Sequence, residues 1–139
     1  MNKKHIVIIG LGGVGGYFGF KINQSNEISK EHKISFIARA ETYKKADLVL
    51  ICVKEYDLEN VCSQLSNVIT EDTIVLPMMN GADIYDRIHT IIPNNIILPS
   101  CVYVASHIKE KGVVEHKGKA GKLIFGKDPK HTTKKIDWI

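Results

Sequence analysis

The stretch His5-Ile-Val-Ile-Ile-Gly-Leu-Gly-Gly-Val-Gly-Gly-Tyr17 carries the strongest structural signal in this sequence. Its first five residues form a short, β-branched and apolar run, which is typical of a strand in a parallel sheet covered on both faces. The run leads directly into glycines that fit the pattern G-x-G-x-x-G, and a helix is expected from 17 to 23. A strand followed by this pattern and a helix predicts a dinucleotide-binding turn.

Each glycine of the pattern has a physical reason. We expect Gly10 to permit a tight turn, Gly12 to let a pyrophosphate approach the backbone, and Gly15 to let the helix pack close to the strand. The free N–H groups at the start of the helix would then bind the phosphate charge. The alternative is a glycine-rich turn that binds no ligand, and the strand-and-helix context favours the nucleotide.

The rest of the chain alternates strand and helix patterns. Further strands are expected at 33–39, 46–53 and 73–76, and helices near 57–68 and 84–91. After Pro93 the pattern changes to strands joined by glycine turns, at 96–104, 113–116 and 123–125. This order predicts one α/β domain over residues 1–139: a Rossmann-type, doubly wound and mainly parallel sheet with a more antiparallel C-terminal part.

The composition excludes several other classes of protein. The chain has 139 residues, of which 44% are hydrophobic and 24% charged, and a net charge of +4. These values are typical of a soluble globular domain and exclude a disordered chain, a collagen and a disulfide-rich scaffold. The basic residues are scattered, so nucleic-acid binding is not expected, and no apolar run approaches the ~20 residues of a membrane span.

The cysteines and histidines indicate neither disulfides nor a metal site. Cys52, Cys62 and Cys101 match no zinc motif. We expect Cys52 and Cys101 to be reduced residues of the core, which favours the cytoplasm. The six histidines form no i, i+4 pair, so no metal site is expected.

Three polar residues follow predicted strands. Arg39 ends the second strand, where an acidic residue would bind the ribose of NAD, and a guanidinium there suits the 2′-phosphate of NADP instead. Lys54 follows the third strand and Asn80 the fourth, at the edge of the sheet where ligands bind. The simpler interpretations are two solvated cations and a plain Asn-Gly turn, but the shared position of these residues favours a site.

One junction does not fit a parallel sheet. Only six residues separate Arg39 from Ala46, whereas a parallel crossover normally needs a dozen or more. Six extended residues reach about 20 Å, which barely returns the chain to the other end of a strand. Either the two strands are not parallel or a segment is missing between Arg39 and Ala46, and we favour a missing segment.

These residues resemble one known family. The run from Gly10 to Gly19, the segments 36–39 and 46–54, the pair Asn80-Gly81 and the region 101–126 are similar to the N-terminal domain of 2-dehydropantoate 2-reductase, also called ketopantoate reductase. The resemblance implies NADPH-dependent reduction of 2-dehydropantoate to pantoate, on the route to pantothenate and coenzyme A. It implies a small 2-keto acid as substrate, no nucleic-acid or membrane partner, and leaves a homodimer open.

The resemblance also assigns roles by position. Asn80 would contact both cofactor and substrate, and Lys54 would line the cofactor site. Arg39 would bind the 2′-phosphate, and Gly118 would touch the cofactor through its backbone. The residues that would bind the pyrophosphate are Gly10, Leu11, Gly12, Gly13, Val14, Gly15 and Gly16.

The chain departs from the family in two respects. The stretch after Arg39 is much shorter, and the helical C-terminal domain, which supplies the catalytic lysine and most substrate contacts in the family, is absent. No catalytic residue is therefore assigned in this chain. We expect the chain alone to bind the cofactor at best, with negligible turnover.

Two other functions remain open. The glycine loop also resembles the ATP-binding loop of the ubiquitin-activating-enzyme-like adenylyltransferases. The second alternative is a regulatory nucleotide-binding domain without catalysis, as attached to some potassium channels. Both types usually place an acidic residue where Arg39 stands, which favours the reductase.

Overall fold

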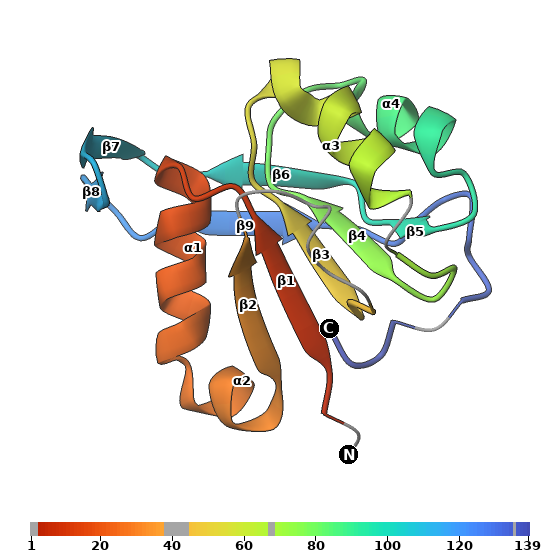
Figure 1. Cartoon of the computed structure of the whole chain (residues 1–139), viewed down its shortest axis with the longest axis horizontal. Helices are drawn as coiled ribbons and strands as arrows, with labels where there is room; N and C mark the ends of the chain where they lie inside the picture. Colours follow the sequence, from red (N-terminus) through yellow and green to blue (C-terminus); the bar gives the residue numbers. More distant parts are fainter. Residues whose placement is uncertain (1–2, 38–44, 67–68, 135) are drawn as a thin grey trace.

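The main sheet of the computed structural model, which describes residues 3–37, 45–66, 69–134 and 136–139, has five parallel strands. Their order is β2-β1-β3-β4-β5 (Figure 1). The strands are β1 His5–Ile9, β2 Lys33–Ile37, β3 Leu48–Ile51, β4 Ile74–Pro77 and β5 Ile96–Ile97. The prediction of a Rossmann-type, mainly parallel sheet is confirmed.

Both faces of this sheet are buried. Side chains alternate between the faces along a strand, so Val7 and Ile9 belong to one core while Ile6 and Ile8 belong to the other. Helices α3 and α4 cover the first face, and helices α1 and α2 pack on the second. The helices are α1 Gly13–Gln24, α2 Asn26–Glu31, α3 Leu58–Leu65 and α4 Ile84–Ile91.

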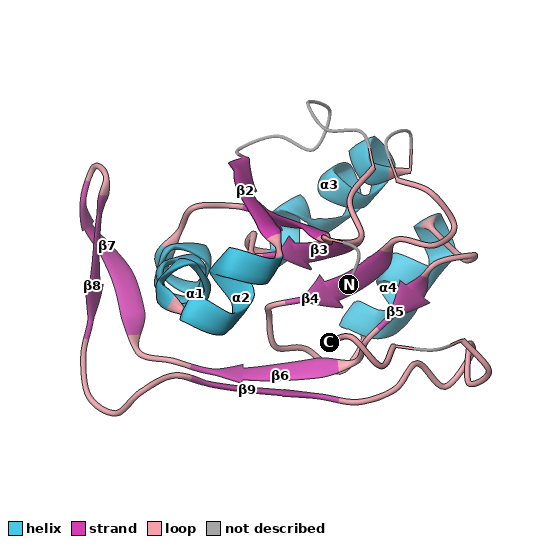
Figure 2. Cartoon of the chain, turned by 90° about the horizontal axis from the view of Figure 1, so that it is seen from below, coloured by secondary structure: helices cyan, strands magenta, loops and turns pink. Residues whose placement is uncertain are grey.

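The C-terminal part is antiparallel, as predicted. Strand β6 (Ser100–Tyr103) pairs with β9 (Lys122–Phe125), and β7 (Ser106–Glu110) pairs with β8 (Val113–His116). Figure 2 shows the β6–β9 ribbon running below the parallel sheet and the β7–β8 hairpin turning up beside α1. The run 96–104 forms two strands rather than one, because Pro99 has no N–H group to continue a ladder.

Three helical and strand features differ from the sequence-based expectation. Helix α1 begins at Gly13 rather than at residue 17, and α2 and β7 were not predicted. Strand β7 is mostly polar and exposed, so it has no apolar pattern and forms through its pairing with β8. No helix among the described residues is both long and apolar enough to traverse a lipid bilayer.

The short junction connects strands that are parallel after all. Strands β2 and β3 lie on opposite sides of β1 and both run parallel to it, so the alternative of a non-parallel pair is wrong. Residues 38–44 lie outside the described residues, and the missing segment stays a prediction. Two hydrogen bonds hold the residues just before β3 in place. The His5 N–H donates to Asp47 Oδ2 at 2.7 Å, and Thr73 Oγ1 donates to the Ala46 carbonyl at 2.7 Å.

The bond from Thr73 generates the first test. Thr73 is fully buried, so Thr73→Val should lower the free energy of unfolding by about 1–3 kcal/mol, because the Ala46 carbonyl loses its donor. Urea denaturation followed by circular dichroism measures the change. In the control Thr90→Val, the hydroxyl bonds the Asp86 carbonyl on an exposed surface, and the change should stay within about 0.5 kcal/mol. Equal losses in both variants would contradict this role of Thr73.

Candidate functional site

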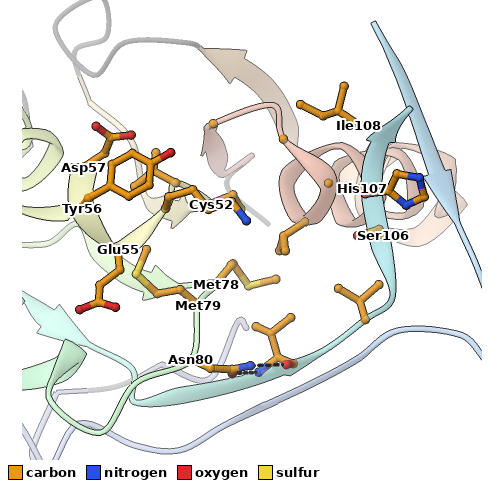
Figure 3. A pocket seen from close by; sticks show the side chains of 18 residues that line it. Cys52, Glu55, Tyr56, Asp57, Met78, Met79, Asn80, Ser106, His107 and Ile108 are labelled. Atoms are coloured by element: carbon orange, nitrogen blue, oxygen red, sulfur yellow. Dashed lines mark hydrogen bonds between the residues drawn. The ribbon is translucent and has the colours of Figure 1, made fainter. Parts of the chain in front are cut away.

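A cavity of about 680 Å³ opens at the carboxyl edge of the parallel sheet. Its walls come from the loop before α1, the residues that follow β3, the residues that follow β4, and the segment 102–108 of β6 and β7. Figure 3 shows Glu55, Tyr56 and Asp57 on one side of this cavity and the β7 side chains on the other. Segments far apart in the sequence therefore enclose one space.

Most of the predicted site residues meet in this cavity. The predicted residues that line it are Gly10, Gly12, Gly13, Val14, Lys54 and Asn80. The predicted residues that do not line it are Leu11, Gly15, Gly16 and Gly118, whose roles stay predictions. Arg39 lies outside the described residues.

The glycines of the loop have different surroundings. Gly10 has a φ of 91°, a conformation that favours glycine. A Cβ at Gly15 would collide with the Gly10 carbonyl oxygen, so only glycine lets α1 pack this close to the strand. A Cβ at Gly12 would meet nothing within 4 Å, although Gly12 lines the cavity. The space at Gly12 is therefore free for a ligand.

Two further glycines are explained by packing against the β7–β8 hairpin. A Cβ at Gly13 would lie 2.6 Å from the Ser106 carbonyl oxygen, and one at Gly16 would lie 2.6 Å from Val114 Cγ2. The hairpin thus closes against the start of α1. Gly16 has a structural reason whether or not a phosphate binds nearby.

The start of α1 directs unpaired backbone donors at the cavity. Gly12 is the N-cap residue, and no side chain caps the helix. The first helical bond runs from the Gly16 N–H to the Gly12 carbonyl at 2.8 Å, so the preceding N–H groups have no partner within the helix. Gly13 and Val14 line the cavity. The site is therefore positively polarised, as an anion requires.

Lys54 adds a positive charge opposite this helix terminus. It is exposed, and in the described ranges it forms no ion pair. The next residue, Glu55, also lines the cavity, and its charge is paired with Arg87 of α4. Arg87 Nη1 lies 2.8 Å from Glu55 Oε1, and Arg87 Nε lies 2.7 Å from Glu59 Oε1. The hydrogen bond from Arg87 also lowers the pKa of Glu59. The sequence analysis missed Arg87, because its partners Glu59 and Glu55 lie 28 and 32 residues earlier in the chain.

Asn80 is engaged with the backbone of β6. Its Nδ2 donates to the Val102 carbonyl at 2.8 Å, and its Oδ1 accepts from the Val102 N–H at 2.8 Å (Figure 3). The side chain is exposed and retains one N–H for a ligand. Asn80 therefore has a structural role, which was not predicted, besides the predicted contact with cofactor and substrate.

The cysteine beside the cavity is a packing residue. Burial raises the pKa of Cys52 to about 12, so the thiol stays protonated and is a poor nucleophile. All three cysteines are free, and Cys52 is buried as expected. Cys101 is only half-buried, because it stands on the outward face of the β6–β9 ribbon.

The comparison with protein families agrees with this architecture. A family model described as ketopantoate reductase PanE/ApbA matches residues 23–130. The chain belongs to this family. The matched range of this PanE/ApbA member includes Lys54 and Asn80 and begins after the glycine loop.

Known relatives are longer than this chain. The uncharacterized oxidoreductase YkpB of Bacillus subtilis (strain 168) is 23% identical over 159 residues, which cover 94% of this chain and 51% of that protein. The chain thus spans about half the length of the curated relative that it matches.

Solved structures share the fold at low sequence identity. A 2-dehydropantoate 2-reductase from Porphyromonas gingivalis W83 has a TM-score of 0.74 at 23% identity, over 94% of this chain and 59% of that one. A D-mandelate dehydrogenase with NADH and anilino(oxo)acetate has a TM-score of 0.67 at 23% identity, over 86% and 47%. A dimeric ketopantoate reductase from Staphylococcus aureus has a TM-score of 0.65 at 20% identity, over 83% and 45%.

The clamp between Asn80 and Val102 leads to a second test. Asn80→Asp should lower the free energy of unfolding at neutral pH by about 1–3 kcal/mol, because a carboxylate oxygen would replace the donor that faces the Val102 carbonyl. Chemical denaturation measures the loss. Asn94→Asp, at an exposed position, introduces the same charge and should change stability by less than about 0.5 kcal/mol. A stable Asn80→Asp protein would argue against the clamp.

Proposed function

We propose that this chain binds NADPH and forms the cofactor-binding part of a reductase that converts 2-dehydropantoate to pantoate. The observation that carries the proposal is the open space at Gly12, where the uncapped start of α1 faces the same cavity as Lys54 and Asn80. Membership in the ketopantoate reductase PanE/ApbA family supports the reaction class.

Each of these residues has a distinct task in the proposal. The N–H groups of Gly13 and Val14 would hold the pyrophosphate, and the Lys54 ammonium would add a positive charge. The remaining N–H of Asn80 would hold a ribose or substrate oxygen. When bound, the nicotinamide supplies a hydride for the C2 carbonyl of the keto acid.

The proton donor for that carbonyl is assigned to no residue of this chain. We place it, with most substrate contacts, in the part of the longer relatives that this chain does not span. The chain alone should therefore show negligible turnover. The alignment with the Bacillus protein runs over 159 positions, more than the 139 residues here, which supports a segment missing from this chain.

The substrate and the setting are also part of the proposal. One protein with a related fold is a D-mandelate dehydrogenase, so another 2-keto acid is the second candidate substrate. The dimeric Staphylococcus aureus reductase supports a homodimer. The free cysteines favour a reducing compartment, the cytoplasm. Family membership disfavours the adenylyltransferase and the non-catalytic regulatory domain.

A calorimetric titration with NADPH, NADH and ATP in parallel tests the cofactor. We expect NADPH to bind most tightly. A preference for ATP would favour the adenylyltransferase instead. If none of the three binds, the proposal that this chain holds the cofactor is wrong.

The glycine loop supplies a matched pair of variants. Gly12→Ala should weaken NADPH binding about 10-fold, or about 1.4 kcal/mol, because the methyl group enters the space left for the ligand. Its stability should fall by no more than about 1 kcal/mol, since the new Cβ meets no protein atom.

Gly15→Ala should lower stability itself. The added Cβ would collide with the Gly10 carbonyl, so the free energy of unfolding should fall by at least about 1–3 kcal/mol. Calorimetry and urea denaturation of both variants separate the two effects, with Gly126→Ala, which has only one ordinary contact, as the control. A Gly12→Ala protein that binds NADPH normally would contradict the proposed pyrophosphate position.

The choice between NADPH and NADH is tested at Arg39. Arg39→Ala should weaken NADPH binding by about 10- to 100-fold, the value of a charged hydrogen bond, and leave NADH binding unchanged. Lys54→Ala should weaken the binding of both cofactors alike, because the proposal places Lys54 at the pyrophosphate, which both cofactors contain. Equal losses of NADPH and NADH binding in Arg39→Ala would show that Arg39 does not bind the 2′-phosphate.

A further inference from the structure

A second cluster of chemically active side chains lies away from the cavity. The segment that follows β9 runs past β5 and α4 (Figure 1), and it brings Asp128 and His131 to His89 of α4. None of these three residues lines the cavity described above. Asp128 and His89 are almost fully buried, and His131 is partly exposed.

Three ligand atoms converge in this cluster. His131 Nδ1 lies 2.8 Å and His89 Nε2 lies 3.3 Å from the same oxygen, Asp128 Oδ2. The three atoms all fall within 4.8 Å of one another. The two imidazole rings are nearly parallel, with an angle of 19° and centroids 5.4 Å apart. Both rings thus present a nitrogen to one point.

The Asp128 carboxylate is crowded by hydrogen-bond partners. Asp128 Oδ1 already accepts from the Tyr85 hydroxyl and the Lys130 N–H, and Oδ2 accepts from the Ile97 N–H at 2.9 Å. A carboxylate offers about four lone-pair positions. The two imidazoles bring the number of groups around it to five. Two imidazole nitrogens therefore share one carboxylate oxygen, and a cation between the three side chains would contact all of them.

The charge state of the cluster suits a divalent metal. Burial lowers the pKa of His89, which favours the neutral imidazole that metals bind. Burial alone would raise the pKa of Asp128, but hydrogen bonds from Tyr85, Ile97 and His131 hold it below its ordinary value. The nearby Lys130 ammonium is paired with Asp86 at 3.3 Å. Two imidazoles and one carboxylate are a common zinc ligand set.

We propose that His89 Nε2, His131 Nδ1 and Asp128 Oδ2 bind a zinc-type divalent cation. Tetrahedral zinc with bonds of 2.0–2.1 Å places its ligand atoms about 3.3 Å apart. The His89–Asp128 separation already has this value, the His131–Asp128 separation is about half an ångström shorter, and the two nitrogens lie within 4.8 Å of each other. Water would take the fourth position, reached from the partly exposed His131 side.

The consequence of metal binding is structural. The ligands come from α4 and from the segment after β9, so the cation would join these two parts of the fold. Tyr85 and the Ile97 N–H orient the carboxylate, as groups behind metal ligands commonly do. The sequence analysis predicted no metal site, because His89 and His131 are far apart in the chain and meet only after folding.

Cobalt titration of the metal-free protein tests the site. We expect one Co²⁺ per chain with the visible absorption of tetrahedral cobalt, no thiolate charge-transfer band in the near ultraviolet, and displacement by Zn²⁺. Zn²⁺ should also raise the melting temperature. A titration without a saturable visible band overturns the proposal directly, whatever the variants do, and so does a thiolate band, which would show a cysteine site.

Variants locate the bound metal. His131→Gln, at the most exposed ligand, should weaken Co²⁺ binding at least about 10-fold. His107→Gln is the matched control, since His107 lies 3.3 Å from Glu115 on an exposed surface, and it should bind Co²⁺ like the unaltered chain. If His131→Gln fails to fold, Co²⁺ binding is measured with Asp128→Asn instead. Normal Co²⁺ binding in a folded ligand variant overturns the proposal. Unchanged NADPH binding in the same variant shows that the metal site is separate from the cavity.

Discussion

The close approach of α1 to the first strand is the constraint on which the site depends. Gly15 lies against the Gly10 carbonyl, where any side chain would collide. This contact brings the start of α1 to the carboxyl edge of the sheet. Because β1, β3 and β4 are parallel, the residues that follow them reach the same edge. A helix terminus with free N–H groups and the Lys54 ammonium therefore share one cavity.

Polar side chains hold the other walls of the cavity in place. Asn80 forms two hydrogen bonds with the Val102 backbone and so fastens β6 to the loop after β4. Arg87 bonds Glu55 and Glu59 and so ties the segment after β3 to α4. The Tyr17 hydroxyl accepts the Gly121 N–H at 2.7 Å and joins α1 to the segment before β9. These contacts hold the segments around the cavity together.

The chain is shorter than the curated relative that it matches. It spans about half the length of the curated relative, and its cavity offers groups for an anionic cofactor but no assigned proton donor. This division has a physical logic. Binding of a dinucleotide uses backbone N–H groups and strand ends, which one α/β domain supplies by itself. In our proposal the groups for the reaction at a carbonyl belong to the part of the longer relative that this chain does not span.

Local sequence patterns were enough to predict the parallel sheet, the turn at Gly10 and the places of Lys54 and Asn80 after strands. These features depend on patterns within a few residues: doubly buried strands are apolar throughout, and the glycine spacing is local. The folded chain was needed to show that β7 is a strand, that Asn80 clamps Val102, that Arg87 bonds Glu55, and that His89 meets Asp128. Strand β7 has no apolar pattern of its own, and the partners in the three side-chain contacts lie between 22 and 39 residues apart, so no local pattern records them. These three contacts arise because folding of the sheet brings distant loops and helices together.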